Sequence, residues 1–107
     1  MIEQKLPNAA SGTITVTNSA TLLTDLMNTA GSVTTNGAVN ANALAVSVGT
    51  VAVRILLDDN TPTSANGLLL TASTVFQFED IVPAKIKLIS TAGNALCDVR
   101  LIKKINK

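Results

Sequence analysis

The feature that most constrains the fold of this chain is a series of short runs in which aliphatic and polar residues alternate. Alternation with a period of two puts successive side chains on opposite faces of a strand, so each run predicts a β-strand with one buried face. In the clearest run, residues 13–17, Ile14 and Val16 would face the core. The other runs lie at residues 44–48, 51–57, 68–70, 74–78, 85–90 and 96–102.

The spacing of these runs indicates how the strands are connected. They recur about every ten residues and are joined by clusters of turn-forming residues, which is typical of an antiparallel sandwich or barrel. A parallel sheet would need helical crossovers, and the chain offers one helix candidate, residues 19–30, with Gly31 after its end. We therefore predict a mainly β protein, an antiparallel, jelly-roll-like β-sandwich of about six to eight short strands with one short helix.

The connections can be predicted in more detail. Residues 32–42 are rich in Thr, Asn and Gly and predict a long loop. The strands on either side of Gly49 and Thr50 are expected to pair as an antiparallel hairpin. Residues 58–67 predict a turn-rich loop. A tight turn at Gly93 precedes the closing strand.

All of these elements fit one domain, residues 13–102, because a chain of 107 residues is long enough for a single core. Residues 103–107 are predicted to form a basic C-terminal tail. Residues 1–12 follow neither period and are predicted to form an extended N-terminal arm, which is either a contact device or a frayed end. As a contact device, the arm would bind a neighbouring protein through a mixed set of side chains: Ile2, Glu3, Lys5, Leu6 and Asn8.

The surface is predicted to be polar but weakly charged. The formal net charge is +1, and charged residues make up 14% of the chain, against about a quarter in typical proteins. Faces rich in Thr, Ser and Asn cost little to desolvate, so the composition favours a protein that other proteins cover. We expect self-association as a trimer or a higher ring. Nucleic acid is not an expected partner, because the C-terminal lysines lack a basic face around them.

Few residues of this chain could support catalysis or bind a metal. With no His and one Cys, zinc sites built from His and Cys and triads that use a His base are excluded. Asp58 and Asp59 lack the spacing of a calcium-binding loop, so an Asx turn is the preferred interpretation and a calcium site the alternative. Glu79 and Asp80 are adjacent and would not converge as a glycosidase pair. Cys97 is predicted to be a small buried hydrophobic residue. We expect no enzyme, no cofactor and no metal.

The sequence shows no segment that would direct it into a membrane. No apolar run at its start has the length of a signal peptide, and no stretch approaches the roughly 18 apolar residues of a membrane span. A lone cysteine is compatible with a reducing cytosol. We therefore expect a soluble protein that is made in the cytoplasm and has no membrane partner.

The order of several segments between Thr13 and Leu101 resembles that of a family of small structural proteins of bacteriophage particles. The resemblance lies in the segments NALAVSV, VAVRILLDD, PTSANGLLL and FQFEDI and in the closing hairpin AKIKLISTAGNALCDVRL. Such proteins often carry Gly before the strand that contains Phe, where this chain has Ser73. The resemblance implies a β-sandwich of the phage head or tail.

The resemblance also implies a function, namely that of a structural virion protein synthesised in the cytoplasm of the bacterial host. Its most concrete form is a capsid decoration or cement subunit that stabilises the particle through multivalent contacts with other virion proteins, the major capsid protein above all. A tail or baseplate component is the alternative in the same class. From a different class, a soluble ligand-binding module would use the loop at residues 58–67 to line a polar pocket.

Overall fold

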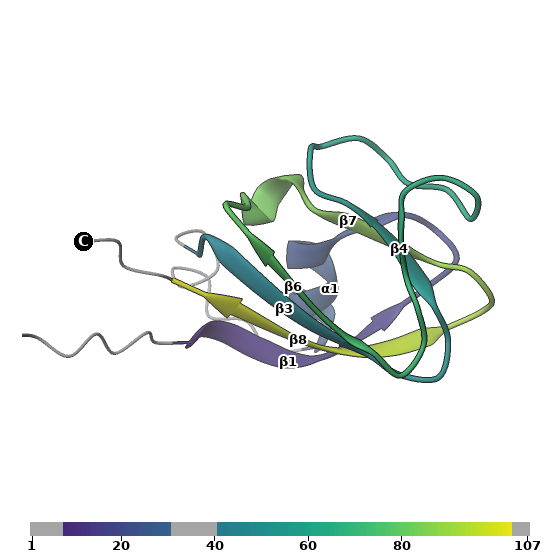
Figure 1. Ribbon diagram of the computed structural model, residues 1–107, viewed down its shortest axis with the longest axis horizontal. Coiled ribbons are helices and arrows are strands. Elements are labelled where there is room, and N and C mark those ends of the chain that lie inside the picture. Colours follow the sequence, from purple (N-terminus) through teal and green to yellow (C-terminus); the bar gives the residue numbers. More distant parts are fainter. Residues whose placement is uncertain (1–7, 31–40, 104–107) are drawn as a thin grey trace, which may run out of the picture.

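The computed structural model describes residues 8–30 and 41–103. These residues form two antiparallel sheets, one α-helix and a short 3-10 helix at Pro83–Lys85 (Figure 1). Sheet A has the strand order β1-β8-β3-β6, with the bounds Asn8–Val16, Ala95–Ile102, Ala43–Val48 and Val75–Glu79. Sheet B has the order β2-β7-β4-β5, with the bounds Thr21–Leu22, Lys87–Ser90, Val53–Leu56 and Leu68–Leu70. This arrangement confirms the predicted antiparallel β-sandwich.

The strand pairing shows how the chain forms these sheets. β1 pairs with β8, β2 with β7, β3 with β6 and β4 with β5, all antiparallel, so the chain is one long hairpin that turns back at residues 57–67. Rolling up this hairpin also places β8 beside β3 and β7 beside β4, which divides the strands between two sheets. Eight strands wound in this way form a jelly roll.

The core lies between the two sheets and consists of aliphatic side chains from alternate strand positions. Ile14 and Val16 of β1 are fully buried, as the alternation predicts. In β8 the inward residues Cys97, Val99 and Leu101 are buried, whereas the residues between them are exposed. The other strands contribute buried side chains of the same kind: Leu44, Val46, Val48, Val53, Ile55, Leu70 and Leu88.

The helix α1 (Leu23–Ala30) closes one side of the sandwich. It packs against β1 and β2 and lies behind the sheets in Figure 1. Its buried side chains join the core: Leu23, Leu26 and Met27. The helix begins later than residue 19, because the chain first forms β2 and pairs with β7.

The first strand begins earlier than predicted. Residues 8–12, predicted as part of the arm, belong to β1 and pair with the end of β8, from Asn8 opposite Ile102 to Gly12 opposite Val99. These residues are small or polar and lack an alternating pattern, so their strand conformation depends on the edge that β8 offers. The arm boundary at Gly12 is therefore wrong. Residues 1–7, 31–40 and 104–107, and the predictions made for them, lie outside the described residues.

The hairpins predicted at Gly49 and at Gly93 are also wrong. β3 and β4 lie in opposite sheets, and so do β7 and β8, so each of these turns crosses from one sheet to the other. Among the described strands, only β4 and β5 are both consecutive in the chain and neighbours in one sheet. Alternation shows that a strand has one buried face, but it does not show which strand lies beside it.

Candidate interaction surface

The side of the sandwich opposite α1 is bounded by β5 and β6, the edge strands of the two sheets. We call it the open side and define it by Leu68, Leu70, Phe76 and Phe78. The two phenylalanines are the inward residues of β6 and are half-buried. The two leucines pair with the inward positions of β4; Leu70 is buried, whereas Leu68 is 52% exposed.

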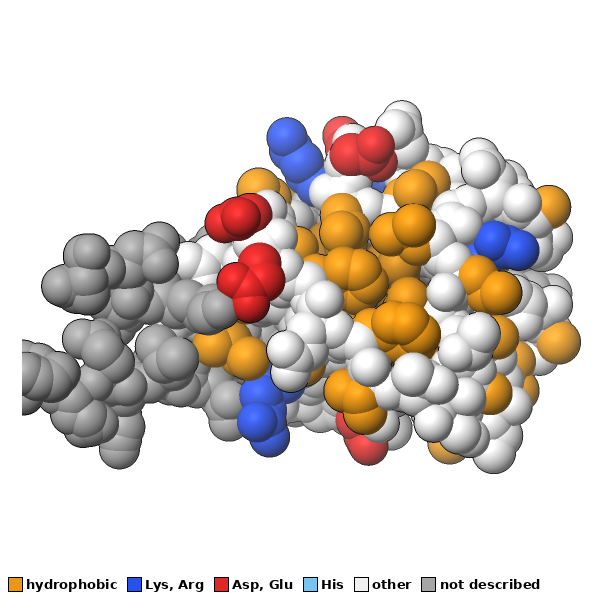
Figure 2. Space-filling view, viewed as in Figure 1, with side chains coloured by type: hydrophobic (Ala, Val, Ile, Leu, Met, Phe, Trp, Pro, Cys, Tyr) orange, Lys and Arg blue, Asp and Glu red, His pale blue; other side chains and the backbone are white. Residues whose placement is uncertain are grey.

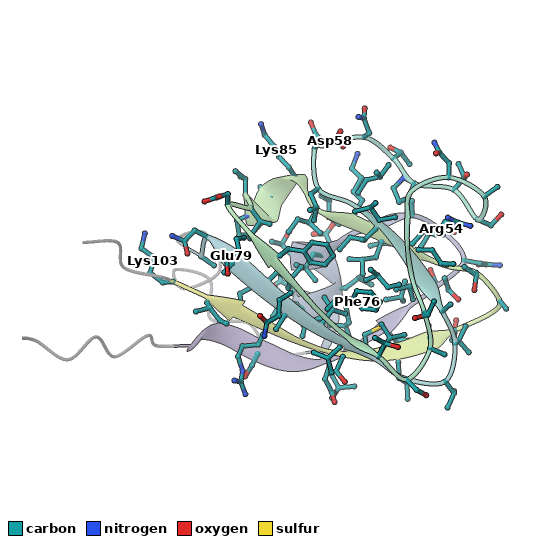
Figure 3. The ribbon with its side chains drawn as sticks, viewed as in Figure 1. Arg54, Asp58, Phe76, Glu79, Lys85 and Lys103 are labelled. Carbon is teal, nitrogen blue, oxygen red and sulfur yellow. The ribbon has the colours of Figure 1, made fainter. Side chains whose placement is uncertain are left out.

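Both aromatic residues of the chain are on the open side. Figure 2 shows hydrophobic side chains gathered in the middle of the viewed face, and Figure 3 places Phe76 in this area. Aromatic side chains contribute large apolar areas to cores and interfaces. Here they pack against the core and leave part of each side chain accessible. The open side is therefore an apolar surface suited to contact with another protein.

The outer face of sheet A carries a shallow hollow of about 520 Å³. Ala45 and Ser47 of β3 have short side chains and lie between longer ones on the neighbouring strands. Asp98 and Arg100 of β8 border the hollow on one side, and Gln77 of β6 borders it on the other. A guanidinium and an amide beside a shallow depression can bind a polar or anionic group.

The loop at residues 58–67 is held against sheet B by two cations. Arg54 of β4 donates hydrogen bonds from Nε to the carbonyl of Ser64 at 3.1 Å and from Nη1 to the carbonyl of Gly67 at 2.9 Å. Lys87 of β7 donates from Nζ to a carbonyl at the start of the loop at 3.2 Å. The loop lines neither of the two described hollows.

Asp58 and Glu79, each from one of the two acidic pairs that the sequence singled out, lie apart in Figure 3. Asp58 accepts hydrogen bonds from the backbone and side-chain nitrogens of Asn60 at 3.3 and 2.9 Å, which is the predicted Asx turn. Among residues 8–30 and 41–103, no group of three or more His, Cys, Asp and Glu could hold a metal ion. Within the same ranges, no helix has the length and apolar character needed to cross a membrane.

Cys97 lies in the core on the inner face of β8, as predicted. Burial above all, together with the negative charge of Asp98, raises the pKa of the thiol to about 11, against an opposing effect of a hydrogen bond with the Gly49 backbone. A thiol with this pKa is protonated at neutral pH and is a poor nucleophile. Cys97 is therefore part of the packing and not of a reactive site.

The predicted contact residues of the arm fall into two groups. Ile2, Glu3, Lys5 and Leu6 lie outside the described residues. Asn8 is the first residue of β1, where its backbone lies opposite Ile102. Asn8 is thus part of a sheet and not of a free arm.

The open side was not predicted as a contact surface. The sequence indicates that Phe76 and Phe78 share one face of a strand, but the position of β6 at a sheet edge depends on pairing between strands that are distant in the chain. One signal could have suggested it: the only two aromatic residues of the chain lie two positions apart in a single strand.

No protein-family model, curated protein or solved structure matches this chain. Its function is therefore inferred from the fold and from the surfaces described above.

Proposed function

We propose that this protein is a structural component of a bacteriophage particle, and most concretely a capsid decoration or cement subunit. The observation that carries the proposal is the open side, where one edge strand carries the only aromatic residues of the chain, both half-buried, and the other edge strand carries the exposed Leu68. Accessible apolar surface of this kind is typical of protein contacts. Jelly rolls also occur in viral capsid domains, which supports the proposal by analogy of fold.

The surface chemistry supports binding through many individually weak contacts. Charged residues make up 14% of the chain, so its faces cost little to desolvate. The chain has no Trp or Tyr, and Arg54 and Arg100 are its only arginines, so it lacks most of the residues that dominate small interfaces. Affinity would come from contact area, sheet edges and repetition over a symmetric shell. The proposed partners are other virion proteins, with the major capsid protein first among them.

Mass spectrometry of purified particles from the phage that encodes this chain tests the proposal. We expect the chain to be present in many copies per particle, and an antibody label to lie over the capsid in electron micrographs. An abundant host cytosolic protein measured in the same sample controls for carry-over. Label confined to the tail would replace the capsid role by the tail or baseplate alternative. Absence of the chain from the particles would refute a virion role.

A second candidate function, a soluble ligand-binding module, is favoured by the hollow on the outer face of sheet A. Arg100 at its border offers a charge for a small carboxylate ligand. Such a ligand would raise the melting temperature of the protein, and Arg100→Ala would remove this rise without disturbing the core, because Arg100 is exposed. A panel of small carboxylates with no effect on the melting temperature would exclude this alternative.

A further inference from the structure

We infer that the open side binds a second copy of this chain, with the two β6 strands paired antiparallel about a two-fold axis at Gln77. The inference concerns contact between copies and holds whether or not the protein belongs to a virion. β6 is the last strand of sheet A among the described residues, so one of its edges has no neighbouring strand there. An edge strand presents backbone N–H and C=O groups that can extend the sheet into another molecule.

β6 lacks the features that normally prevent such pairing. Proteins protect edge strands with Lys, Pro or β-bulges. β6 has the sequence Val-Phe-Gln-Phe-Glu and pairs with β3 in an uninterrupted register. Its one charged residue, Glu79, is at the end of the strand, and the central Gln77 is exposed and uncharged. The edge is therefore available for pairing along most of its length.

The sequence of β6 is self-complementary in one register. With Gln77 opposite Gln77 of the second copy, Phe76 of each copy lies opposite Phe78 of the other, and Val75 lies opposite Glu79. Cross-strand aromatic pairs are favourable, and this register places no two like charges opposite each other. Each half-buried phenylalanine would be covered further by a phenylalanine of the second copy.

The rest of the open side fits the same axis. A two-fold axis perpendicular to sheet A leaves the inner faces of the two copies of sheet A on the same side of the joined sheet. The β5 strands of the two copies therefore approach each other, and the exposed Leu68 of each copy gains an apolar neighbour. Glu79 and Arg54 lie toward opposite ends of the viewed face in Figure 3. Because the axis reverses the direction of β6, the two copies run in opposite directions. Glu79 of each copy therefore lies toward the same end of the pair as Arg54 of the other copy. This charge distribution favours the pair.

An isologous contact of this kind closes on itself. It therefore produces a dimer, in place of the trimer or ring expected from composition alone.

Single cysteine substitutions test the register. Gln77→Cys places one thiol of each copy at the axis, where directly opposite Cβ atoms are about 4.5–5.5 Å apart and a small shift of the two strands brings them within the range of a disulfide. Glu79→Cys is the matched control, because in this register the two copies of position 79 are about 14 Å apart along the strands. The native thiol of Cys97 is buried and gives little background. Under mild oxidation we expect a linked dimer of Gln77→Cys and a monomer of Glu79→Cys on a non-reducing gel. Linkage of both variants, or of neither, would overturn the register.

Sedimentation velocity tests the contact without a crosslink. We expect the unmodified full chain to sediment with twice the monomer mass of 11.0 kDa at a concentration on the order of tens of micromolar, and Gln77→Lys to lose the dimer because it opposes two positive charges. Thr15→Lys, at an exposed position of the other edge strand of sheet A, should keep it. Circular dichroism checks that both variants are folded. A monomeric unmodified chain, or a dimer lost in Thr15→Lys and kept in Gln77→Lys, would overturn the proposal.

Discussion

Cys97 links the packing of a single residue to the pH dependence of the whole fold. The thiol is 1% exposed on the inner face of β8, and burial is the main reason for its raised pKa. Cys97 is the only cysteine of the chain, so a substitution at this position removes the titrating thiol. Comparison of such a variant with the unmodified protein therefore isolates the effect of the thiol on stability.

The folded pKa of about 11 exceeds the ordinary value of 9.0, so the folded protein holds the thiol proton more tightly than the unfolded chain. The stability that this provides is fully present below about pH 9 and is lost as the pH rises toward 11, by about 3 kcal/mol. Urea unfolding over this range should show the decrease, and Cys97→Val should show a flatter pH dependence. Equal slopes for the two proteins would contradict this pH dependence.

The burial of Cys97 also predicts how fast its thiol reacts. Thiol labelling should be slow in the native state and fast on unfolding. Rapid labelling of the native protein would mean that the register of β8 is shifted by one residue.

Ser73 is held in a backbone conformation that favours glycine. Its φ is 59°, and its N–H donates to the carbonyl of Gly49 at 2.7 Å, which holds the turn between β5 and β6. A residue with a Cβ atom is disfavoured in this conformation by roughly 1–2 kcal/mol. Glycine would remove this cost, but it also increases the conformational entropy of the unfolded chain, which offsets part of the gain in stability. We expect Ser73→Gly to raise the free energy of unfolding by about 0.5 kcal/mol. Ser47→Gly in β3 should lower it by a similar or larger amount. If urea titrations show that both substitutions destabilise the protein, the proposed backbone strain at Ser73 would be contradicted.

At the scale of elements, the sequence predicts strands better than it predicts their neighbours. Leu44, Val46 and Val48 alternate because one face of β3 meets the core, and this local pattern is enough to locate the strand. The strands that pair with β3 depend on how the long hairpin rolls up, and no local sequence pattern predicts this. For the same reason, the shared face of Phe76 and Phe78 was predictable but the open side was not. Residues 8–12 became a strand through β8 and had no pattern of their own.

Arg54 is the side chain that most directly joins the loop at residues 58–67 to sheet B. Its guanidinium donates to two loop carbonyls, and a single ammonium cannot reproduce this geometry. We expect Arg54→Lys to lower the free energy of unfolding by about 1–2 kcal/mol and to speed amide hydrogen exchange in the loop. Arg100→Lys, at an exposed position of β8, is the matched control and should change stability by less than about 0.5 kcal/mol. Unchanged exchange in the loop of Arg54→Lys would show that other contacts hold it.

At the scale of the whole molecule, the two sides of the jelly roll differ in how they are closed. The helix α1 packs against β1 and β2 on one side, while the edges of β5 and β6 bound the open side on the other. One row of paired residues crosses sheet A from β1 to β6. Asn8 of β1 lies opposite Ile102 of β8, Ile102 lies opposite Ala43 of β3, and Ala43 lies opposite Glu79 of β6. The N-terminal residues therefore join the domain at the end of sheet A where β6 ends.

This position allows the arm and the fold to be tested separately. Deleting residues 1–7 leaves β1 complete, so we expect the free energy of unfolding to change by less than about 0.5 kcal/mol. Deleting residues 1–12 also removes the pairing of Asn8 through Gly12 with β8 and should destabilise the domain clearly. Urea unfolding of the two truncated proteins provides this comparison and shows which one is suitable for assembly experiments.

If the protein is a decoration subunit that uses its arm, the shorter deletion should reduce its incorporation into particles while the fold stays intact. A reduction of about tenfold corresponds to the loss of about 1.4 kcal/mol of binding free energy per subunit. Replacing Ile2, Glu3, Lys5 and Leu6 with Ser at full chain length is the matched variant, because it removes the candidate contacts without shortening the chain. The measurement is the copy number per particle by mass spectrometry, together with the temperature at which the particles open. Incorporation of both variants at the unmodified level would mean that the arm makes no important contact, and the binding surface would then lie on the jelly roll itself, with the open side as the first region to mutate.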